Sequence, residues 1–361
     1  MGEPVGVGIV GCGFISGQYL ATLATLPALR VAAVADQDPA RARAVADRLD
    51  GARAGSVDDV LSADDVDVVL NLTTPEAHAD IAARAIAFNK DVYGEKPLAR
   101  STAEASPLLS AAAAAGVRLG CAPDTVLGTG IQTARRAIDE GRLGVPTAAT
   151  AVMVTAGHER WHPHPDFYYQ PGGGPLFDMG PYYLTALVTL LGPVHSLTAM
   201  ASRSRDSRMI GQGPRAGEHV PVAVDTHVSG VLRHHDGVVS TVLMSFDGDA
   251  TTAAPIEVHG TEGSMVVPDP NQFIGDVSVY SRQTGWTLVP PSAGWLRAGR
   301  GYGLADLVAA GSGIEPRANG SLAYHVLDVM ESMLTSARTG RAVEVASTCT
   351  RPAPVPLAAS F

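Results

Sequence analysis

The sequence predicts two domains of different class. Residues 1–123 are expected to form a doubly wound parallel α/β sheet, and residues 124–361 an α+β domain with a large, mostly antiparallel open sheet. Three observations lead to this prediction. The chain of 361 residues has the length of two domains. Its first third alternates apolar runs with alanine-rich stretches, and after residue 123 the pattern changes to successive strand-like runs with turn signals between them.

In the first domain, near-continuous apolar runs indicate strands that are buried on both faces, as in parallel sheets. We expect these strands at residues 5–10, 30–35, 66–70, 91–93 and 117–121. Helices are expected between them, at residues 14–26, 39–49, 75–88 and 102–115. Pro39 at a helix start and Gly116 at a helix end agree with the usual preferences at helix termini.

In the second domain, a helix is expected at residues 129–140, closed by Gly141 and Gly144. Strands are expected at residues 147–155, 196–203, 222–233, 238–246, 256–259 and 278–281. Two further helices are expected at residues 181–191 and 322–339. A run of strands with few helices is typical of an α+β domain on an antiparallel sheet.

Composition argues against several classes of protein. The formal net charge is −10, from 26 basic and 36 acidic side chains, and no basic cluster is present. We therefore expect neither a nucleic-acid partner nor a membrane-surface partner. No apolar run approaches the roughly 18 residues of a membrane span, and the first residues do not resemble a secretory signal. The three cysteines, Cys12, Cys121 and Cys349, are far apart in the sequence, which indicates reduced thiols in a cytoplasmic protein.

A glycine-rich turn follows the first expected strand and precedes the first expected helix. Its cofactor-binding candidates are Gly11, Gly13, Phe14 and Ile15. In a Rossmann domain such a turn brings the backbone close to a pyrophosphate at a helix N-terminus. Glycine-rich turns also occur for backbone reasons alone. Asp36, at the end of the second strand, supports the functional interpretation because its carboxylate can accept both ribose hydroxyls. Asp36 would also repel a 2′-phosphate, so NAD is the expected cofactor.

Lys96 lies in a Glu-Lys-Pro run just after an expected strand, at the sheet edge where open α/β sheets bind ligands. Most lysines are solvated surface residues. This chain, however, has only two lysines, Lys90 and Lys96, and otherwise uses arginine. An ammonium can release a proton or stabilise an alkoxide as a point charge, and an arginine cannot do the first. Lys96 is therefore a catalytic candidate.

Asp178 and Tyr182 lie near the start of the helix expected at residues 181–191. Asp178 could be an N-terminal cap and nothing more. If the helix instead begins by residue 178, the two side chains share one face because they are four residues apart. A carboxylate and a phenol close to a lysine can form a proton-transfer site.

The segment His158-Glu-Arg-Trp-His162 matches the HExxH pattern of zinc proteases. That mechanism needs both histidines on one face of a stable helix. Gly157, Pro163 and Pro165 would break such a helix, so we expect no metal site here. We expect instead a loop that lines a pocket for a polar, sugar-like ligand, with His158, Arg160 and Trp161 as substrate contacts.

Along nearly its whole length the chain resembles the glucose–fructose oxidoreductase / inositol dehydrogenase / MocA family. The resemblance lies in the glycine-rich turn with Asp36, residues 74–78 (Thr-Pro-Glu-Ala-His), the Glu-Lys-Pro run, residues 172–182, residues 260–263 and the late helix around His325. It implies a Rossmann domain followed by an open-sheet domain that often forms homodimers or homotetramers. Activity on a hydroxyl or carbonyl of a sugar, inositol or related compound with NAD(P) is also implied.

The resemblance also implies roles for particular residues. Lys96 and Asp178 match the catalytic lysine and aspartate of the family. Tyr182 stands where the commoner pattern has histidine and is similar to the glucose–fructose oxidoreductase and dihydrodiol dehydrogenase branches. Asp124 is a possible substrate contact. Further cofactor contacts are implied for Thr73, Pro75, His78, Glu95 and Lys96.

The function expected from the sequence is an NAD-dependent oxidoreductase that moves hydride between a sugar, polyol or glycoside and nicotinamide. Tyr182 or Asp178 would be the base, and Lys96 would stabilise the alkoxide. Two alternatives remain at this point. One is a redox-neutral glycosidase or lyase that oxidises the sugar only transiently, and the other is a sugar or dinucleotide sensor without enzymatic activity.

Overall fold

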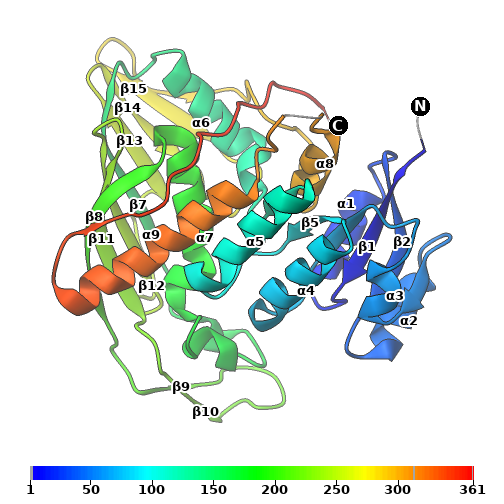
Figure 1. The fold of residues 1–361 in the computed structure, drawn as a ribbon. Helices are drawn as coiled ribbons and strands as arrows, with labels where there is room; N and C mark the ends of the chain where they lie inside the picture. The colour runs from blue at the N-terminus through cyan, green and yellow to red at the C-terminus, as the bar shows by residue number, and fades with distance from the viewer. Residues whose placement is uncertain (1–2, 312–313, 360) are drawn as a thin grey trace. The chain divides into compact units, whose positions relative to one another are not determined.

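The computed structural model describes residues 3–311, 314–359 and 361 (Figure 1). Its contacts divide the chain into two compact units. The first contains residues 1–127, 295–324 and 358–361, and the second contains residues 128–294 and 325–357. The first crossing lies close to the boundary expected at residue 123. The return of residues 295–324 to the first unit was not expected.

A six-stranded parallel sheet forms the centre of the first unit, in the order β3-β2-β1-β4-β5-β6. The strands are β1 (Val5–Val10), β2 (Leu29–Ala35), β3 (Arg53–Gly55), β4 (Val68–Asn71), β5 (Asp91–Gly94) and β6 (Leu119–Cys121). The order reverses between β1 and β4, and ligands bind at such a switch point in doubly wound sheets. The predicted Rossmann fold is confirmed.

Five helices connect these strands: α1 (Ser16–Leu23), α2 (Pro39–Ala46), α3 (Val57–Leu61), α4 (Pro75–Ala87) and α5 (Thr102–Ala115). Their termini follow local sequence signals. The Asp38 side chain caps α2 by accepting the backbone N–H of Ala40, and the Ser101 side chain caps α5 by accepting the backbone N–H of Glu104. Gly116 ends α5 in the left-handed conformation expected of a C-terminal glycine.

The returning segment adds α8 (Tyr302–Ala309) to the first unit, beside β5 and β6. The Arg118 guanidinium is the main link. It pairs with Asp91 and donates to the carbonyl oxygens of Leu307 and Ala310 at 2.6 and 3.0 Å. Cys121 N–H donates to the carbonyl of Ala318 at 3.0 Å. The segment is therefore bonded to the edge strand of the parallel sheet.

The second unit contains a nine-stranded mixed sheet in the order β16-β15-β14-β13-β7-β12-β11-β8-β17. Only β7 and β12 pair in parallel, as expected for a mostly antiparallel sheet. Its strands are β7 (Pro146–Val154), β8 (Val194–Ser202), β11 (His227–His234), β12 (Val239–Ser245), β13 (Ile256–Gly260), β14 (Gly263–Val267), β15 (Val277–Ser281), β16 (Gly285–Val289) and β17 (Val343–Glu344). A separate hairpin is formed by β9 (Ser207–Met209) and β10 (His219–Pro221).

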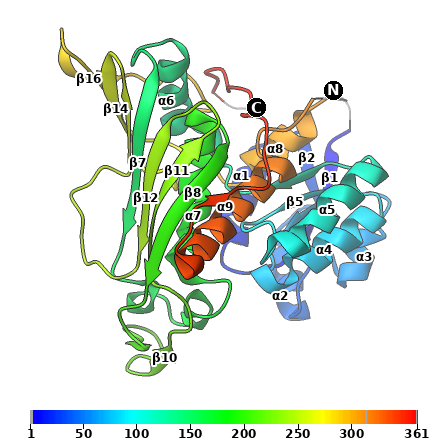
Figure 2. The same ribbon diagram turned by 60° about the vertical axis from the view of Figure 1, so that its left-hand side comes forward.

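Helices α6 (Thr129–Asp139), α7 (Gly174–Leu191) and α9 (Gly320–Thr339) accompany this sheet. Figure 2 shows α7 and α9 along one face of the strands β12, β11 and β8. Contacts of α7 with β7, β11 and β12 agree with that view. Along β11 and β12, buried residues alternate with more exposed ones. This pattern is typical of an antiparallel sheet with one face packed against helices and the other facing solvent.

Several predicted bounds were wrong. The helix expected to begin at residue 181 begins at Gly174. The proline in its first turn, where proline is favoured, is Pro175, whereas Pro181 lies inside the helix. The strand expected over residues 222–233 begins only at His227. The short elements β3, α3, β9, β10, β14, β16, β17 and α8 were not predicted.

Candidate active site

The glycine-rich turn leads from β1 to α1. Gly11 has φ +102°, and a Cβ there would lie 2.5 Å from the carbonyl oxygen of Leu72, so only glycine fits. Gly13 has no heavy atom within 4 Å of the place of a Cβ. No side chain caps the N-terminus of α1 at Ile15, and Phe14 is exposed. This end of α1 therefore has the open backbone that an anionic group needs.

Asp36 lies at the end of β2 and is bonded to the same turn. Its Oδ2 accepts the N–H of Cys12 at 2.7 Å, and its Oδ1 accepts the N–H of Asp38 at 2.8 Å. Because each carboxylate oxygen can accept a further hydrogen bond, both remain suitable for ribose hydroxyls. Turn and carboxylate together fit a dinucleotide with a free 2′-hydroxyl.

Glu95 and Lys96 follow β5 at the carboxyl edge of the sheet. The buried Glu95 carboxylate accepts the Tyr19 hydroxyl at 2.9 Å through Oε1 and the Lys96 N–H at 3.0 Å through Oε2. Burial, together with the nearby Glu95, raises the pKa of Tyr19 well above its usual range, so Tyr19 stays a neutral donor. This arrangement fixes the backbone that carries Lys96 and uses Glu95 as its support.

His78 connects the loops after β4 and β5. It is buried, with Nδ1 2.7 Å from the Pro97 carbonyl oxygen and Nε2 3.0 Å from that of Thr73. Asn71 accepts the Thr73 hydroxyl at 2.7 Å and donates to the His78 carbonyl at 3.0 Å. Thr73, His78 and the Lys96–Pro97 peptide are thus brought together, and Pro75 begins α4 beside them. Because both its ring nitrogens contact backbone, His78 has the geometry of a support for these loops.

Asp124 does not have the geometry of the predicted substrate contact. Its side chain is fully buried, and its Oδ2 accepts the N–H groups of Gly301 and Gly303 at 2.8 and 3.0 Å, at the start of α8. Burial raises the pKa of Asp124. These contacts support a structural role in holding α8.

Asp178 and Tyr182 both lie on α7, in the second unit. Because α7 begins at Gly174, Asp178 lies within the helix and the interpretation as an N-terminal cap is wrong. Residues four apart share a helix face, so the carboxylate and phenol lie on the same side of α7. The Asp178 side chain is 14% exposed, and Tyr182 is buried.

His158 approaches this face from the segment that follows β7. Its Nε2 lies 2.7 Å from Oδ2 of Asp178. His158 and Glu159 belong to a single 3-10 turn, η2 (His158–Arg160), and His162 follows it. Nδ1 of His162 accepts the N–H of His164, so the two histidines lack the α-helical placement that a zincin needs. Trp161 is exposed, and Arg160 pairs with Asp249 at 2.7 Å.

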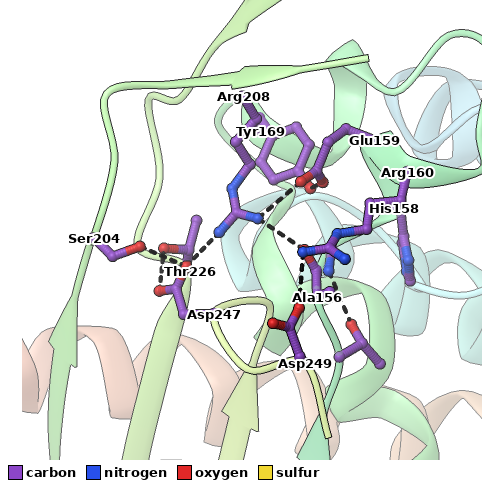
Figure 3. Close-up of polar contacts among 12 residues, drawn as sticks. Ala156, His158, Glu159, Arg160, Tyr169, Ser204, Arg208, Thr226, Asp247 and Asp249 are labelled. Atoms are coloured by element: carbon purple, nitrogen blue, oxygen red, sulfur yellow. Dashed lines mark hydrogen bonds and ion pairs between the residues drawn. The ribbon is translucent and has the colours of Figure 1, made fainter. Parts of the chain in front are cut away.

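A buried ionic network underlies this turn (Figure 3). Arg208 pairs with Glu159 at 3.0 Å and with Asp247, and it donates to the Ala156 carbonyl at 3.1 Å. The Tyr169 hydroxyl donates to Glu159. Sequence reasoning missed this network because Arg208 and Asp247 are distant in sequence from the HERWH segment and carry no motif. Among the residues that the structure describes, no group of three acidic, His or Cys side chains could hold a metal ion.

A glycine-rich turn with Asp36 in one unit, and a carboxylate and a phenol on one face of a helix in the other, are the features expected of an NAD-binding oxidoreductase. Comparison with known proteins agrees. The family described as "Oxidoreductase family, NAD-binding Rossmann fold" matches residues 5–122, and the GFO/IDH/MocA C-terminal domain matches residues 131–266. The chain belongs to the GFO/IDH/MocA family, and the expected family and cofactor are confirmed.

Two curated relatives are sugar enzymes by name. A 1,5-anhydro-D-fructose reductase from Ensifer adhaerens is 30% identical over 58% of this chain and 60% of its own length. A D-apiose dehydrogenase from Paraburkholderia graminis is 26% identical over 94% of this chain and 89% of its own. A levoglucosan dehydrogenase solved with NADH and L-sorbose superposes with a TM-score of 0.82 over 96% of this chain and all of its own, at 21% identity, which shows the shared fold. In the described residues, no helix is long and apolar enough to cross a membrane.

Proposed function

We propose that this protein transfers hydride between NAD and a hydroxyl or carbonyl carbon of a sugar, polyol or glycoside. The observation that carries the proposal is the pair Asp178 and Tyr182 on one face of α7, in a chain whose other unit has a glycine turn and an aspartate suited to NAD. The names of the relatives support a carbohydrate as substrate.

The residues proposed to hold the cofactor are Gly11, Gly13, Phe14, Ile15 and Asp36. When bound there, NAD would supply the acceptor for the hydride of the carbinol carbon in the oxidative direction. Thr73, Pro75, His78 and Glu95 contribute by keeping the loops after β4 and β5 in place, as their mutual contacts suggest.

In the substrate reaction, Lys96 provides a positive charge for the oxygen that becomes an alkoxide. Tyr182 or Asp178 takes the hydroxyl proton. A phenol has an ordinary pKa of about 10 and needs a nearby cation to act as a base at neutral pH, whereas a carboxylate does not. Arg160 and Trp161 are proposed to contact the sugar, since an exposed indole is suited to the apolar face of a sugar and a guanidinium to its hydroxyls. His158 was a further candidate for this contact, but both of its ring nitrogens have partners in the protein, Asp178 and Trp161.

A panel of sugars, polyols and glycosides with NAD tests the proposal. We expect stoichiometric NADH with at least one member, measured by absorbance. Release of aglycone with only catalytic NAD and no net NADH would instead establish the redox-neutral alternative. If no member of the panel, nor the corresponding ketoses and lactones with NADH, shows turnover while calorimetry shows NAD binding, the catalytic proposal is refuted.

A further inference from the structure

The contact between His158 and Asp178 carries an inference beyond the roles assigned so far. The two side chains come from segments 20 residues apart and meet at 2.7 Å between Nε2 and Oδ2. Both are largely withdrawn from solvent, at 12% and 14% exposure. An ionised group in such a place needs a hydrogen-bonding partner, and the imidazole is one for Asp178.

The second ring nitrogen defines the tautomer of His158. The Trp161 indole Nε1–H lies 3.3 Å from His158 Nδ1. An indole N–H can only donate, so Nδ1 accepts, and a neutral imidazole then has its proton on Nε2. That proton points to Asp178. The two contacts together describe a donor aimed at one carboxylate oxygen.

Aromatic contacts hold the imidazole in place. The ring of His158 lies 4.5 Å from that of Tyr168 and 4.6 Å from that of Phe246, measured between centroids. Tyr168 belongs to η3 (Asp166–Tyr169), and Phe246 follows β12. Asp178 from α7 and Tyr168 from η3 are therefore ionisable groups that face the ring. His162 is a further neighbour. Its own pKa is lowered mainly by burial and, to a smaller extent, by His158.

The turn that carries His158 is supported by the network of Figure 3. Glu159, the next residue, is bonded to Arg208 and Tyr169, and the Arg208 and Glu159 side chains are only 2% and 5% exposed. Gly157, the preceding residue, has φ +100°, and a Cβ there would collide with Glu159, Arg208 and Tyr169. A buried charge network adds little to the free energy of unfolding, because removing the charges from water is costly. It does favour one conformation of the turn, because each charge has fixed partners.

We propose that His158 is the positioning residue of Asp178: its Nε2–H holds the carboxylate in one rotamer and in its ionised form for the reaction. This inference rests on the proposed function, since it assigns how that site is prepared. Loss of the donor should lower kcat, while affinity for NAD, which binds the other unit, should stay unchanged.

The kinetic test uses two matched variants. His158→Phe keeps a ring against Tyr168 and Phe246 but has no donor, and His158→Gln keeps an N–H donor without the ring. We expect His158→Phe to lose about 10²-fold in kcat, at the lower end of general-base contributions, with KM nearly unchanged. The acid limb of its kcat/KM profile should move to higher pH. His158→Gln should recover most of kcat and the wild-type profile.

The exposed His164 of the same loop provides the control, and His164→Phe should behave as wild type. Wild-type kinetics in His158→Phe would overturn the proposal. Equal losses in both His158 variants, with raised KM and an unmoved pH profile, would do so as well, because they would indicate a substrate contact only. Thermal unfolding of each variant separates these outcomes from loss of the fold.

A readout without turnover keeps the inference separate from the proposed function. Imidazole ¹H–¹⁵N correlation spectra of the full chain should show His158 as the Nε2–H tautomer with a slowly exchanging proton. Asp178→Ala should abolish that slow exchange. If the wild-type protein turns over no substrate but the spectra agree, the proposed function fails while the pairing stands. A Nδ1–H tautomer in the wild type would refute the pairing.

Discussion

Asp36 serves both the turn and the expected cofactor. By accepting the N–H groups of Cys12 and Asp38, its carboxylate ties the end of β2 to the glycine turn. The same negative charge opposes a 2′-phosphate. The cation nearest in sequence is Arg41, which pairs with Asp38 at 3.5 Å. We therefore expect the preference between NAD and NADP to depend on the Asp36 carboxylate, since the cation nearest to it in sequence is already paired with Asp38.

We predict that NAD(H) binds more tightly than NADP(H), as measured by calorimetric titration. Asp36→Ser keeps a hydrogen-bond acceptor for the turn but removes the charge, so the preference for NAD should narrow. Without the Asp36 charge, we expect Arg41 to reach the 2′-phosphate of NADP. Adding Arg41→Ala to Asp36→Ser should then restore part of the preference for NAD. Equal or tighter NADP(H) binding by the wild-type protein would show that the role assigned to Asp36 is wrong.

Lys96, Asp178 and Tyr182 are predicted to act as a unit. Lys96→Ala should lower kcat by orders of magnitude with NAD affinity nearly intact, and Lys96→Arg should recover little, because a guanidinium is planar and does not release its proton. Tyr182→Phe removes only a hydroxyl, and a loss of about 10²–10⁴-fold would identify the phenol as the base. A silent Tyr182→Phe beside an inactive Asp178→Asn would assign that role to Asp178.

The triple variant is the check on this prediction. Groups that act together give strongly non-additive losses, so the triple variant should be little worse than the worst single one. Additive losses would contradict a concerted site, and full activity of Lys96→Ala would contradict the proposed chemistry.

Residue chemistry was readable from the sequence where it lay in local motifs. The glycine turn, Asp36 and the Glu-Lys-Pro run are each defined within a few residues of a strand end, so their placement followed from the strands. The supports of the site were not readable. Tyr19 meets Glu95, and Arg208 meets Glu159, across long stretches of chain, and each looks like an ordinary residue of its own element.

At the scale of elements, helix α7 shows how one misread signal affects a site. Pro181 suggested a helix start, which left Asp178 at the cap position. The true start is at Gly174, with Pro175 in the first turn, so Asp178 and Tyr182 are both helical. Hydrophobic runs predicted the longer strands well, whereas β9, β10 and β16 are short and depend on pairing partners that local propensity does not reveal.

Helix α9 is attached to β8 through a buried histidine. The His325 Nε2 accepts the N–H of Val194 at 2.9 Å, so Nδ1 carries the proton and donates to Ser347 at 3.0 Å. Burial lowers the pKa of His325 to about 4. Protonation would also replace the accepted hydrogen bond with a clash of two N–H donors. The attachment therefore requires a neutral imidazole.

Stability should fall as the pH drops below the ordinary histidine pKa of about 6.5, because the unfolded chain binds a proton there that the folded chain refuses. Between pH 8 and pH 5 this amounts to about 2 kcal/mol. Urea unfolding at both values should show it, and His325→Gln, which keeps an acceptor, should reduce the difference. The exposed His219→Gln is the control. An unchanged difference in His325→Gln would contradict the assignment.

At the scale of the molecule, the sheet of the second unit has one face with no helix among the described residues of that unit. Strand register places exposed side chains on this face: Met200 pairs with Ser229, Val231 with Thr241, and Tyr280 with Trp286. The exposed apolar residues on it are Met200, Val231, Val239, Tyr280, Trp286 and Leu288. Apolar side chains spread over so many strands are typical of an association surface.

We propose that this outer face joins two copies of the chain, in a homodimer or as part of a homotetramer. Light scattering after size exclusion should give a multiple of the 37.2 kDa chain mass. Leu288 is 61% exposed in the chain alone, so Leu288→Asp should not disturb the fold of a monomer but would bury a charge in an interface. We expect this variant to dissociate toward monomer with unchanged far-UV circular dichroism.

The matched control replaces a residue of similar exposure that belongs to the other unit. Ile314 is 65% exposed and belongs to the first unit, so Ile314→Asp should leave the oligomer intact. A wild-type monomer at micromolar concentration would refute the proposed association. An oligomer that survives Leu288→Asp and also Met200→Asp, at the other end of the same face, would show that the copies meet through a different surface.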